Sequence, residues 1–159
     1  MFLYEKDLKD AFREKYKSRD NVKNYAFEIG RSGGADLITF EYLNNRYEYN
    51  AFEFKIDNIS KAILQANYNL KYSHKSWIVL PEEKRNIIQN KYYTQIKWTR
   101  GLGVIFVREG GYYDFFIKPM PNDSVLVNQE LLKLAVYSKD IGKKEANKNL
   151  MKYIFFQYQ

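Results

Sequence analysis

The sequence NAFEFKI at residues 50–56 decides the fold that we expect for this chain. Its apolar side chains alternate with a period of two, which predicts a β-strand with Phe52 and Phe54 on one face and Glu53 and Lys55 on the other. A strand that is followed by a long amphipathic helix is usually buried on both faces. Burying unpaired charge costs free energy, so Glu53 and Lys55 need a partner or a chemical role.

Working outward from this strand, the sequence predicts a mixed α/β domain that spans residues 1–159. We expect Asn44-Asn45 to form the hairpin turn before it and Asp57-Asn58 to cap the helix after it. Because that helix crosses over the sheet, the next strand should run parallel to the strand of Glu53. The expected helices are Phe2–Lys17, Ile59–Tyr72, Glu82–Thr94, Asn128–Tyr137 and Lys143–Phe156, and the expected strands are Tyr25–Ile29, Ala35–Leu43, Arg46–Ile56, Ser76–Leu80, Leu102–Arg108 and Tyr112–Ile117.

The composition predicts a folded protein with excess positive charge. A hydrophobic share of 45% in 159 residues is enough for a core, and the absence of cysteine excludes disulfides and cysteine-based metal sites. The net charge of +7 favours a polyanionic partner such as nucleic acid. A second interpretation stays open, because abundant Lys, Asn, Ile and Tyr are also typical of a gene rich in A and T. Neither an apolar run of membrane-spanning length nor a leader is present, so we expect no membrane contact and a cytoplasmic location.

Two acidic residues, Asp36 and Glu53, suggest a metal site. Carboxylate oxygens are the ligands that hard divalent cations prefer, and the expected hairpin joins the strands that carry these two residues. Lys55 would then stand beside the water or phosphate that the metal activates. The competing interpretation is that Glu53 and Lys55 form the solvated face of an edge strand.

Four segments around these residues resemble the PD-(D/E)XK nuclease superfamily, which has a restriction-endonuclease-like or Holliday-junction-resolvase-like fold. They are GGADL at residues 33–37, AFEFK at 51–55, KAILQ at 61–65 and WIVLP at 77–81. The resemblance covers Phe2 to Pro81. It implies a mixed central sheet flanked by helices, with the core order αβββαβ over about residues 1–81. Residues 82–159 would extend the sheet and add C-terminal helices.

The resemblance also implies a role for individual residues. Asp36 and Glu53 would be the metal ligands, together with the backbone carbonyl of Phe54. Lys55 would be the catalytic lysine, and Gln65 a supporting polar residue on the following helix. The implied cofactor is Mg²⁺, for which Mn²⁺ could substitute.

A glutamate on the first helix often joins the site in this family. Glu5 is the better candidate here, and Glu14 is the alternative. The chain departs from the family pattern at Ala35, where the motif is named for a proline. Proline is widely replaced at this position in relatives.

Basic and aromatic residues are candidates for contacts with nucleic acid, because aromatic rings stack on bases and basic side chains attract phosphates. The alternative for each aromatic residue is an ordinary place in the core or on the sheet. His74 is the only histidine and lies in a polar turn, so we expect it to be a surface-loop residue. The nucleic-acid candidates are Arg31, Tyr68, Tyr72, Lys97 and Arg100.

The function that we expect is metal-dependent hydrolysis of phosphodiester bonds by a DNA endonuclease with a D…ExK site. Two alternatives stay open: a catalytically inactive nucleic-acid-binding module of the same fold, and a ribonuclease. The expected partner is nucleic acid, DNA before RNA, and a homodimer or a partner protein is a further possibility. Nucleotide hydrolysis is not expected, because the glycines at residues 33–34 lack the setting of a phosphate-binding P-loop.

Overall fold

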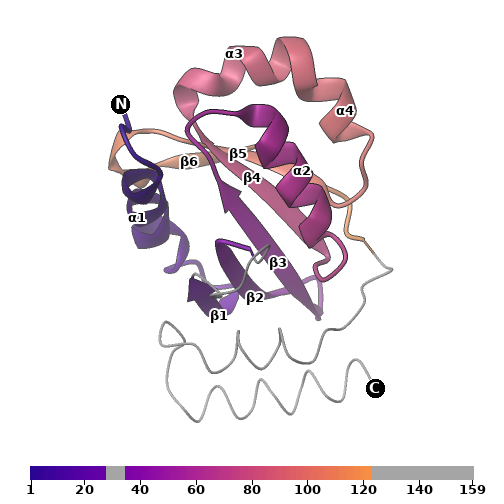
Figure 1. Ribbon diagram of the computed structural model, residues 1–159. Helices are drawn as coiled ribbons and strands as arrows, with labels where there is room; N and C mark the ends of the chain where they lie inside the picture. Colours follow the sequence, from indigo (N-terminus) through magenta and orange to yellow (C-terminus); the bar gives the residue numbers. More distant parts are fainter. Residues whose placement is uncertain (28–34, 123–159) are drawn as a thin grey trace.

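The computed structural model describes residues 1–27 and 35–122, in which six strands form one sheet whose spatial order follows the order of the chain (Figure 1). The strands are β1 Val22–Phe27, β2 Leu37–Leu43, β3 Arg46–Phe54, β4 Lys75–Pro81, β5 Leu102–Val107 and β6 Tyr113–Ile117. The two longer helices are α1 Glu5–Tyr16 and α2 Ile59–Asn69. The shorter elements are η1 Glu82–Lys84, α3 Arg85–Ile87, η2 Ile88–Tyr92, α4 Tyr93–Lys97 and η3 Glu109–Gly111.

The sheet is mixed, as the sequence predicted. Strands β1, β2 and β3 are antiparallel, β3, β4 and β5 are parallel, and β6 is antiparallel to β5. Helix α2 connects β3 to β4, and the parallel pairing of these two strands confirms the expected crossover. The α/β class is therefore confirmed. Over the described ranges, every helix is too short or too polar to cross a membrane.

The turn between β2 and β3 is formed by Asn44 and Asn45, as predicted. Both residues have left-handed backbones, with φ angles of 52° and 63°. Two such residues in a row make the tight turn whose twist matches that of the flanking strands, and asparagine tolerates this conformation better than most residues. The turn fixes the pairing of the whole hairpin, from Leu43 opposite Arg46 to Leu37 opposite Phe52.

Two hydrophobic clusters pack on opposite faces of the sheet, one under α1 and one under α2 (Figure 1). On the first face, Phe12 of α1 packs against Phe52 and Phe54, which alternate along β3 as the sequence predicted. On the second face, α2 buries the stripe that its helical period predicts, and the side chain of Asn58 caps it by accepting a hydrogen bond from the backbone N of Lys61 at 3.3 Å. The buried stripe of α2 consists of Ile59, Ala62, Ile63 and Ala66.

The prediction of one continuous α-helix over Glu82–Thr94 is wrong. The chain instead forms a series of short turns that ends at Lys97 and includes a π-helical turn at Ile88–Tyr92. A π-helical turn adds one residue to the helix, which rotates the following side chains by about 100°. This rotation brings Ile96 back to the side of Ile88, and both side chains are fully buried against the sheet.

Several element ends also differ from prediction. Strand β1 begins earlier, at Val22, strand β3 ends at Phe54, and helix α2 ends at Asn69. Strand β3 ends early because the chain turns toward Asn58, whose left-handed backbone (φ 55°) opens the next helix. The predicted helices at 128–137 and 143–156, and the last residues of the predicted strand at 25–29, lie outside the described residues.

Candidate active site

Asp36 and Glu53 face each other at the open end of the β2–β3 hairpin. The last ladder pair is Leu37 opposite Phe52, so the next residue of each strand is Asp36 on one side and Glu53 on the other. The backbone N of Asp36 donates to the carbonyl of Phe52 at 3.1 Å, and the backbone N of Phe54 donates to Asp36 Oδ2 at 3.0 Å. Strand β3 therefore holds Asp36 from both sides of Glu53, its backbone through Phe52 and its carboxylate through Phe54.

Glu53 is a buried carboxyl group, only 3% exposed. Its strand lies between β2 and β4, so the interpretation of a solvated edge strand is wrong. Asn69 of α2 donates from Nδ2 to Glu53 Oε1 at 2.8 Å. Burial raises the pKa of Glu53 to about 8, and the negative charge of Asp36 and a hydrogen bond to its carboxyl group act in the same direction. Without a cation, the pair therefore retains a proton at neutral pH.

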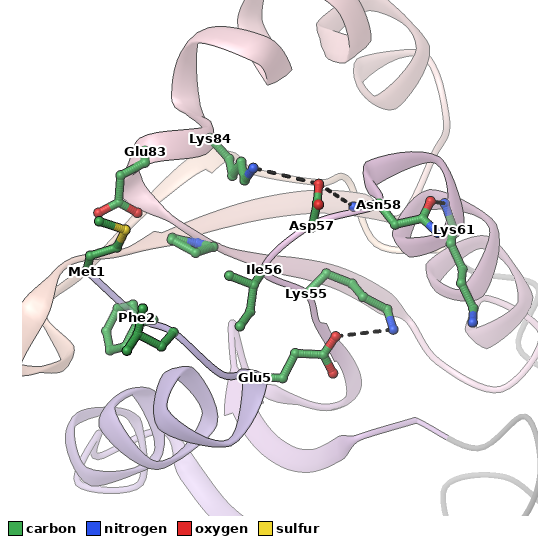
Figure 2. Close-up of a pocket in the computed structure, with 12 residues that line it drawn as sticks. Met1, Phe2, Glu5, Lys55, Ile56, Asp57, Asn58, Lys61, Glu83 and Lys84 are labelled. Atoms are coloured by element: carbon green, nitrogen blue, oxygen red, sulfur yellow. Dashed lines mark hydrogen bonds and ion pairs between the residues drawn. The ribbon is translucent and has the colours of Figure 1, made fainter.

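Lys55 follows directly after the end of β3. Its backbone N donates to the carbonyl of Val79 at 3.1 Å, and its ammonium lies 3.5 Å from Glu5 Oε1 of α1 (Figure 2). The side chain is 16% exposed, so it is held in place yet reachable from solvent. Of the two candidate glutamates on α1, the structure brings Glu5 to the site, whereas Glu14 pairs with Lys17 at 3.2 Å.

Helix α2 supplies a second amide near the site. Gln65, the predicted supporting residue, lies one turn before Asn69, and its buried Oε1 has no hydrogen-bond partner within the described part of the chain. The direct contact with Glu53 belongs to Asn69, which sequence reasoning missed. The sequence could have indicated Asn69, because it lies four residues after Gln65 and residues four apart on a helix lie on the same face.

Sequence reasoning also missed Lys9. This residue lies one helical turn after Glu5, and its ammonium is 4.0 Å from Asp36 Oδ1. One lysine therefore stands near each end of the acidic pair: Lys9 beside Asp36, and Lys55 two residues after Glu53.

The donor set fits a hard divalent cation. Among the described residues, no three or more His, Cys, Asp or Glu side chains gather in a metal-binding group, so the acidic pair stands by itself. Mg²⁺ is commonly held by only one or two carboxylates, with waters and substrate phosphates as its other ligands. The buried Glu53, whose pKa is raised to about 8 by burial and by the half-buried Asp36 beside it, also forms an arrangement that a divalent cation would relieve. The carbonyl of Phe54, predicted as a third ligand, belongs to the residue between Glu53 and Lys55.

A cavity of about 610 Å³ adjoins Lys55 and Glu5 (Figure 2). Its wall combines apolar side chains with lysines and with the acidic residues Glu5, Asp57 and Glu83. It is large enough for a ligand of the size that proteins usually enclose. The apolar residues include Phe2, Ile56 and Pro81, and the lysines are Lys55, Lys61 and Lys84.

Two of the predicted nucleic-acid contacts, Lys97 and Arg100, lie away from Lys55 along the parallel strands. Arg100 is exposed and donates from Nε to the carbonyl of Pro121 at 2.9 Å. It precedes Leu102, which pairs with Ser76 near the start of β4, and so lies toward the opposite end of the parallel strands from Lys55. The exposed Lys97 ends the neighbouring α4.

Tyr68 is 44% exposed on α2 and packs edge-to-face against Tyr72, with a ring separation of 6.0 Å. Arg31 lies outside the described residues.

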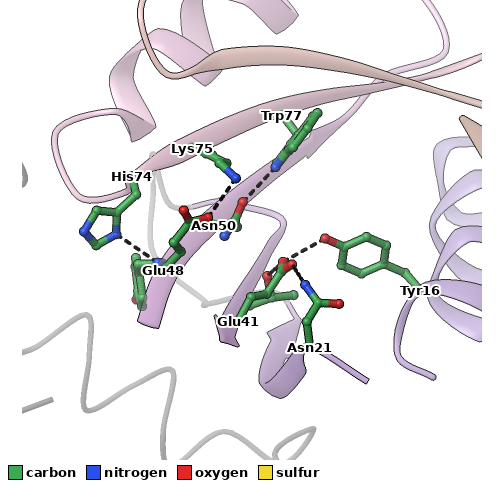
Figure 3. A network of polar contacts seen from close by, with 10 residues as sticks. Tyr16, Asn21, Glu41, Glu48, Asn50, His74, Lys75 and Trp77 are labelled. Carbon is green, nitrogen blue, oxygen red and sulfur yellow. Dashed lines mark hydrogen bonds and ion pairs between the residues drawn. The ribbon is translucent and has the colours of Figure 1, made fainter. Parts of the chain in front are cut away.

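A second polar cluster lies on the α1 face, away from Lys55 (Figure 3). Glu41, only 5% exposed, accepts hydrogen bonds from the side chains of Tyr16, Thr39 and Asn21 at 2.7, 2.5 and 2.9 Å. Burial, with the charge of Glu41, raises the pKa of Tyr16 well above its usual value. With its carboxylate satisfied by three donors, this cluster has the character of a structural network.

The expectation that His74 is a surface-loop residue is wrong. Its side chain is 8% exposed, and Nδ1 accepts a hydrogen bond from the backbone N of Tyr49 at 2.9 Å (Figure 3). His74 therefore provides the hydrogen-bond acceptor for a backbone N–H of β3, and this contact accounts for the burial of a polar turn residue.

Chemically, the first site combines two facing carboxyl groups with two nearby ammonium groups, those of Lys9 and Lys55. Such a set can hold a cation, orient a phosphate and stabilise negative charge that develops on it. No protein-family model matches the chain, and a comparison with curated proteins finds no match. Any functional assignment therefore depends on the residues of the site.

Proposed function

We propose that this protein is a metal-dependent nuclease that hydrolyses phosphodiester bonds of DNA at Asp36, Glu53 and Lys55. The observation that carries the proposal is the placement of Asp36 opposite Glu53, with Lys55 two residues after Glu53, directly after the end of β3. Burial of Glu53 supports it further, because a buried carboxyl group beside a second acidic side chain is costly unless it serves a purpose. The resemblance to the PD-(D/E)XK superfamily implies the same roles.

In this proposal Asp36, Glu53 and the carbonyl of Phe54 hold Mg²⁺, for which Mn²⁺ can substitute. A bound Mg²⁺ lowers the pKa of a water ligand and neutralises charge on the phosphate. The protein's own task is to present the oxygens in a fixed arrangement. Asn69 does this for Glu53 through its 2.8 Å hydrogen bond, and the backbone N of Phe54 does it for Asp36 at 3.0 Å.

Lys55 supplies a donor to the reacting phosphate. Its backbone is tied to β4 through Val79, and Glu5 holds its ammonium from the other side. A preorganised ammonium stabilises the negative charge that builds on the phosphate oxygens or orients the attacking water. The unpartnered Oε1 of Gln65 is available to accept a hydrogen bond from that water or from Lys55.

The net charge of +7 favours a polyanionic substrate, and the cavity beside Lys55 offers room for the part of the strand next to the cleaved bond. DNA is the substrate that we propose. RNA shares the same phosphate chemistry, so a direct comparison must separate the two.

The test is cleavage of supercoiled plasmid, linear duplex, single-stranded DNA and RNA by the purified protein in Mg²⁺ and in Mn²⁺. Cutting should stop in EDTA and in the variants Glu53→Gln and Asp36→Asn, because each of these removes a metal ligand or the metal itself. Glu14→Gln is the matched control, since it changes a glutamate of α1 that pairs with Lys17 away from the site.

The other outcomes separate the alternatives. Cutting that persists in Glu53→Gln would rule out the proposed site. Binding of DNA without cutting in either metal would favour the inactive binding module, and cutting confined to RNA would favour the ribonuclease.

A further inference from the structure

Helix α1 is fixed rigidly against the strand that carries Glu53. Leu8 and Phe12 are fully buried, and the Phe12 ring lies 5.8 Å from that of Phe52 and 5.5 Å from that of Phe54. These two phenylalanines flank Glu53 in the sequence. The packing that holds the helix is thus adjacent to the acidic pair, and side chains on the same side of α1 have defined positions at the site.

A close approach on another side of α1 also fixes the helix. Gly111, in the turn between β5 and β6, has a left-handed backbone with φ of 85°. A side chain there would collide with the backbone carbonyl of Ala11 on α1. The absence of a side chain lets the turn lie directly against the helix, so α1 is confined by both β3 and η3.

The packing of α1 places Lys9 next to Asp36. Its side chain is 18% exposed, and its ammonium lies 4.0 Å from Asp36 Oδ1. Charge-assisted hydrogen bonds between ammonium and carboxylate groups are about 2.7–2.9 Å long. At 4.0 Å the Lys9 ammonium attracts Asp36 electrostatically, but the separation is too long for such a hydrogen bond. Lys6, three residues earlier on α1, is 86% exposed and pairs with Asp10 along the helix.

We propose that Lys9 is a second phosphate-binding lysine of this site, which contacts the nucleic-acid backbone on the Asp36 side while Lys55 contacts it on the other. The inference rests on the proposed function for its substrate class. Two ammonium groups near one acidic pair, Lys9 beside Asp36 and Lys55 after Glu53, can contact neighbouring phosphates of one strand.

The simpler alternative is that Lys9 only offsets the charge of Asp36. That role would affect the stability of the protein but would leave its contacts with DNA unchanged. The salt dependence of DNA binding separates the two roles, because each phosphate contact releases counterions and adds about one to the slope of log K against log salt.

The experiment measures this slope by fluorescence anisotropy with labelled duplex DNA in Mg²⁺. All proteins carry Glu53→Gln, so that binding is followed without cutting. Lys9→Gln should lower the magnitude of the slope by about one, and Lys9→Arg should retain it. Lys6→Gln, the matched control on the same helix, should bind as the parent does. Circular dichroism on heating confirms that each variant is folded.

In a protein that retains Glu53, the Lys9→Gln substitution should slow cutting on the order of 10²-fold, the usual effect of losing one preorganised donor. If Lys9→Gln and Lys6→Gln show the same slope, the inference is wrong even if the wild type cuts DNA normally. If the slope falls but the wild type cuts nothing, the phosphate contact stands and the proposed nuclease activity fails. Absence of any DNA binding overturns both.

Discussion

Asp36 stands opposite Glu53 because the turn that joins their strands contains only two residues. The ladder begins with Leu43 opposite Arg46 and continues without a break to Leu37 opposite Phe52. A slip of one residue would move each side chain of one strand to the other face of the sheet. The Asn44-Asn45 turn thus sets the geometry of the site from the far end of the hairpin.

The turn itself should be sensitive to side-chain shape. Asn45→Val should destabilise the protein by about 1–2 kcal/mol, because a β-branched residue is strained at its φ of 63°. Asn45→Gly should be neutral or stabilising, since glycine adopts this conformation freely. Urea unfolding of the two variants checks the prediction, and equal losses of stability would contradict it.

Stability without metal should fall with rising pH through the titration of Glu53. Its pKa of about 8 in the folded protein lies above the value near 4.5 that the carboxyl group has in the unfolded chain. The folded state therefore binds the proton more tightly, and stability decreases as pH rises from the lower value to the higher one. Above about pH 8 the loss is complete.

Glu53→Gln should remove this slope, which is on the order of 1.4 kcal/mol per pH unit for one proton. Thermal unfolding in EDTA between about pH 5 and about pH 9 compares the two proteins. The variant should be the more stable at the alkaline end. A wild type whose stability follows that of Glu53→Gln at every pH would show that Glu53 has an ordinary pKa.

Asn69→Ala should weaken the site from the α2 side. It removes the 2.8 Å hydrogen bond to Glu53 and leaves a buried carboxyl group short of a donor, at a cost of about 1–3 kcal/mol. Cutting should slow as well, because Glu53 loses the group that orients it. Asn67→Ala, on the same helix, is the control and should change both properties less.

Glu41→Ala should unfold the protein more readily without any direct role in cutting. The substitution leaves the buried donors of Tyr16 and Thr39 without their acceptor, each at a cost of about 1–3 kcal/mol. Chemical denaturation measures the loss. At a temperature where the variant is folded, its cutting rate per folded molecule should equal that of the wild type.

The hairpin and the crossover could be predicted because both depend on local sequence. Alternation around Glu53, two asparagines in the turn and a cap at Asn58 act within a few residues of one another. The contacts of Asn69 and Lys9 depend instead on how two helices dock against opposite faces of the sheet. Their helical spacing from Gln65 and Glu5 indicates the correct face, but spacing alone does not fix the tilt of a helix.

Two errors show the same limit. His74 is polar and lies in a turn, yet it is buried because it accepts a hydrogen bond from a neighbouring strand. The π-helical turn at Ile88–Tyr92 arises because Ile88 and Ile96 both need to reach the sheet. In each case a distant part of the chain overrides the local preference.

The attachment of α1 has a consequence for the order in which the site assembles. The hairpin that pairs Asp36 with Glu53 closes over a short loop, which is a fast event in a folding chain. Glu5 and Lys9 arrive only after α1 has docked through Phe12, a contact between distant parts of the sequence. A newly synthesised chain would therefore form its acidic pair before its lysines are in place, and chemistry that needs both would begin only when the first helix is seated.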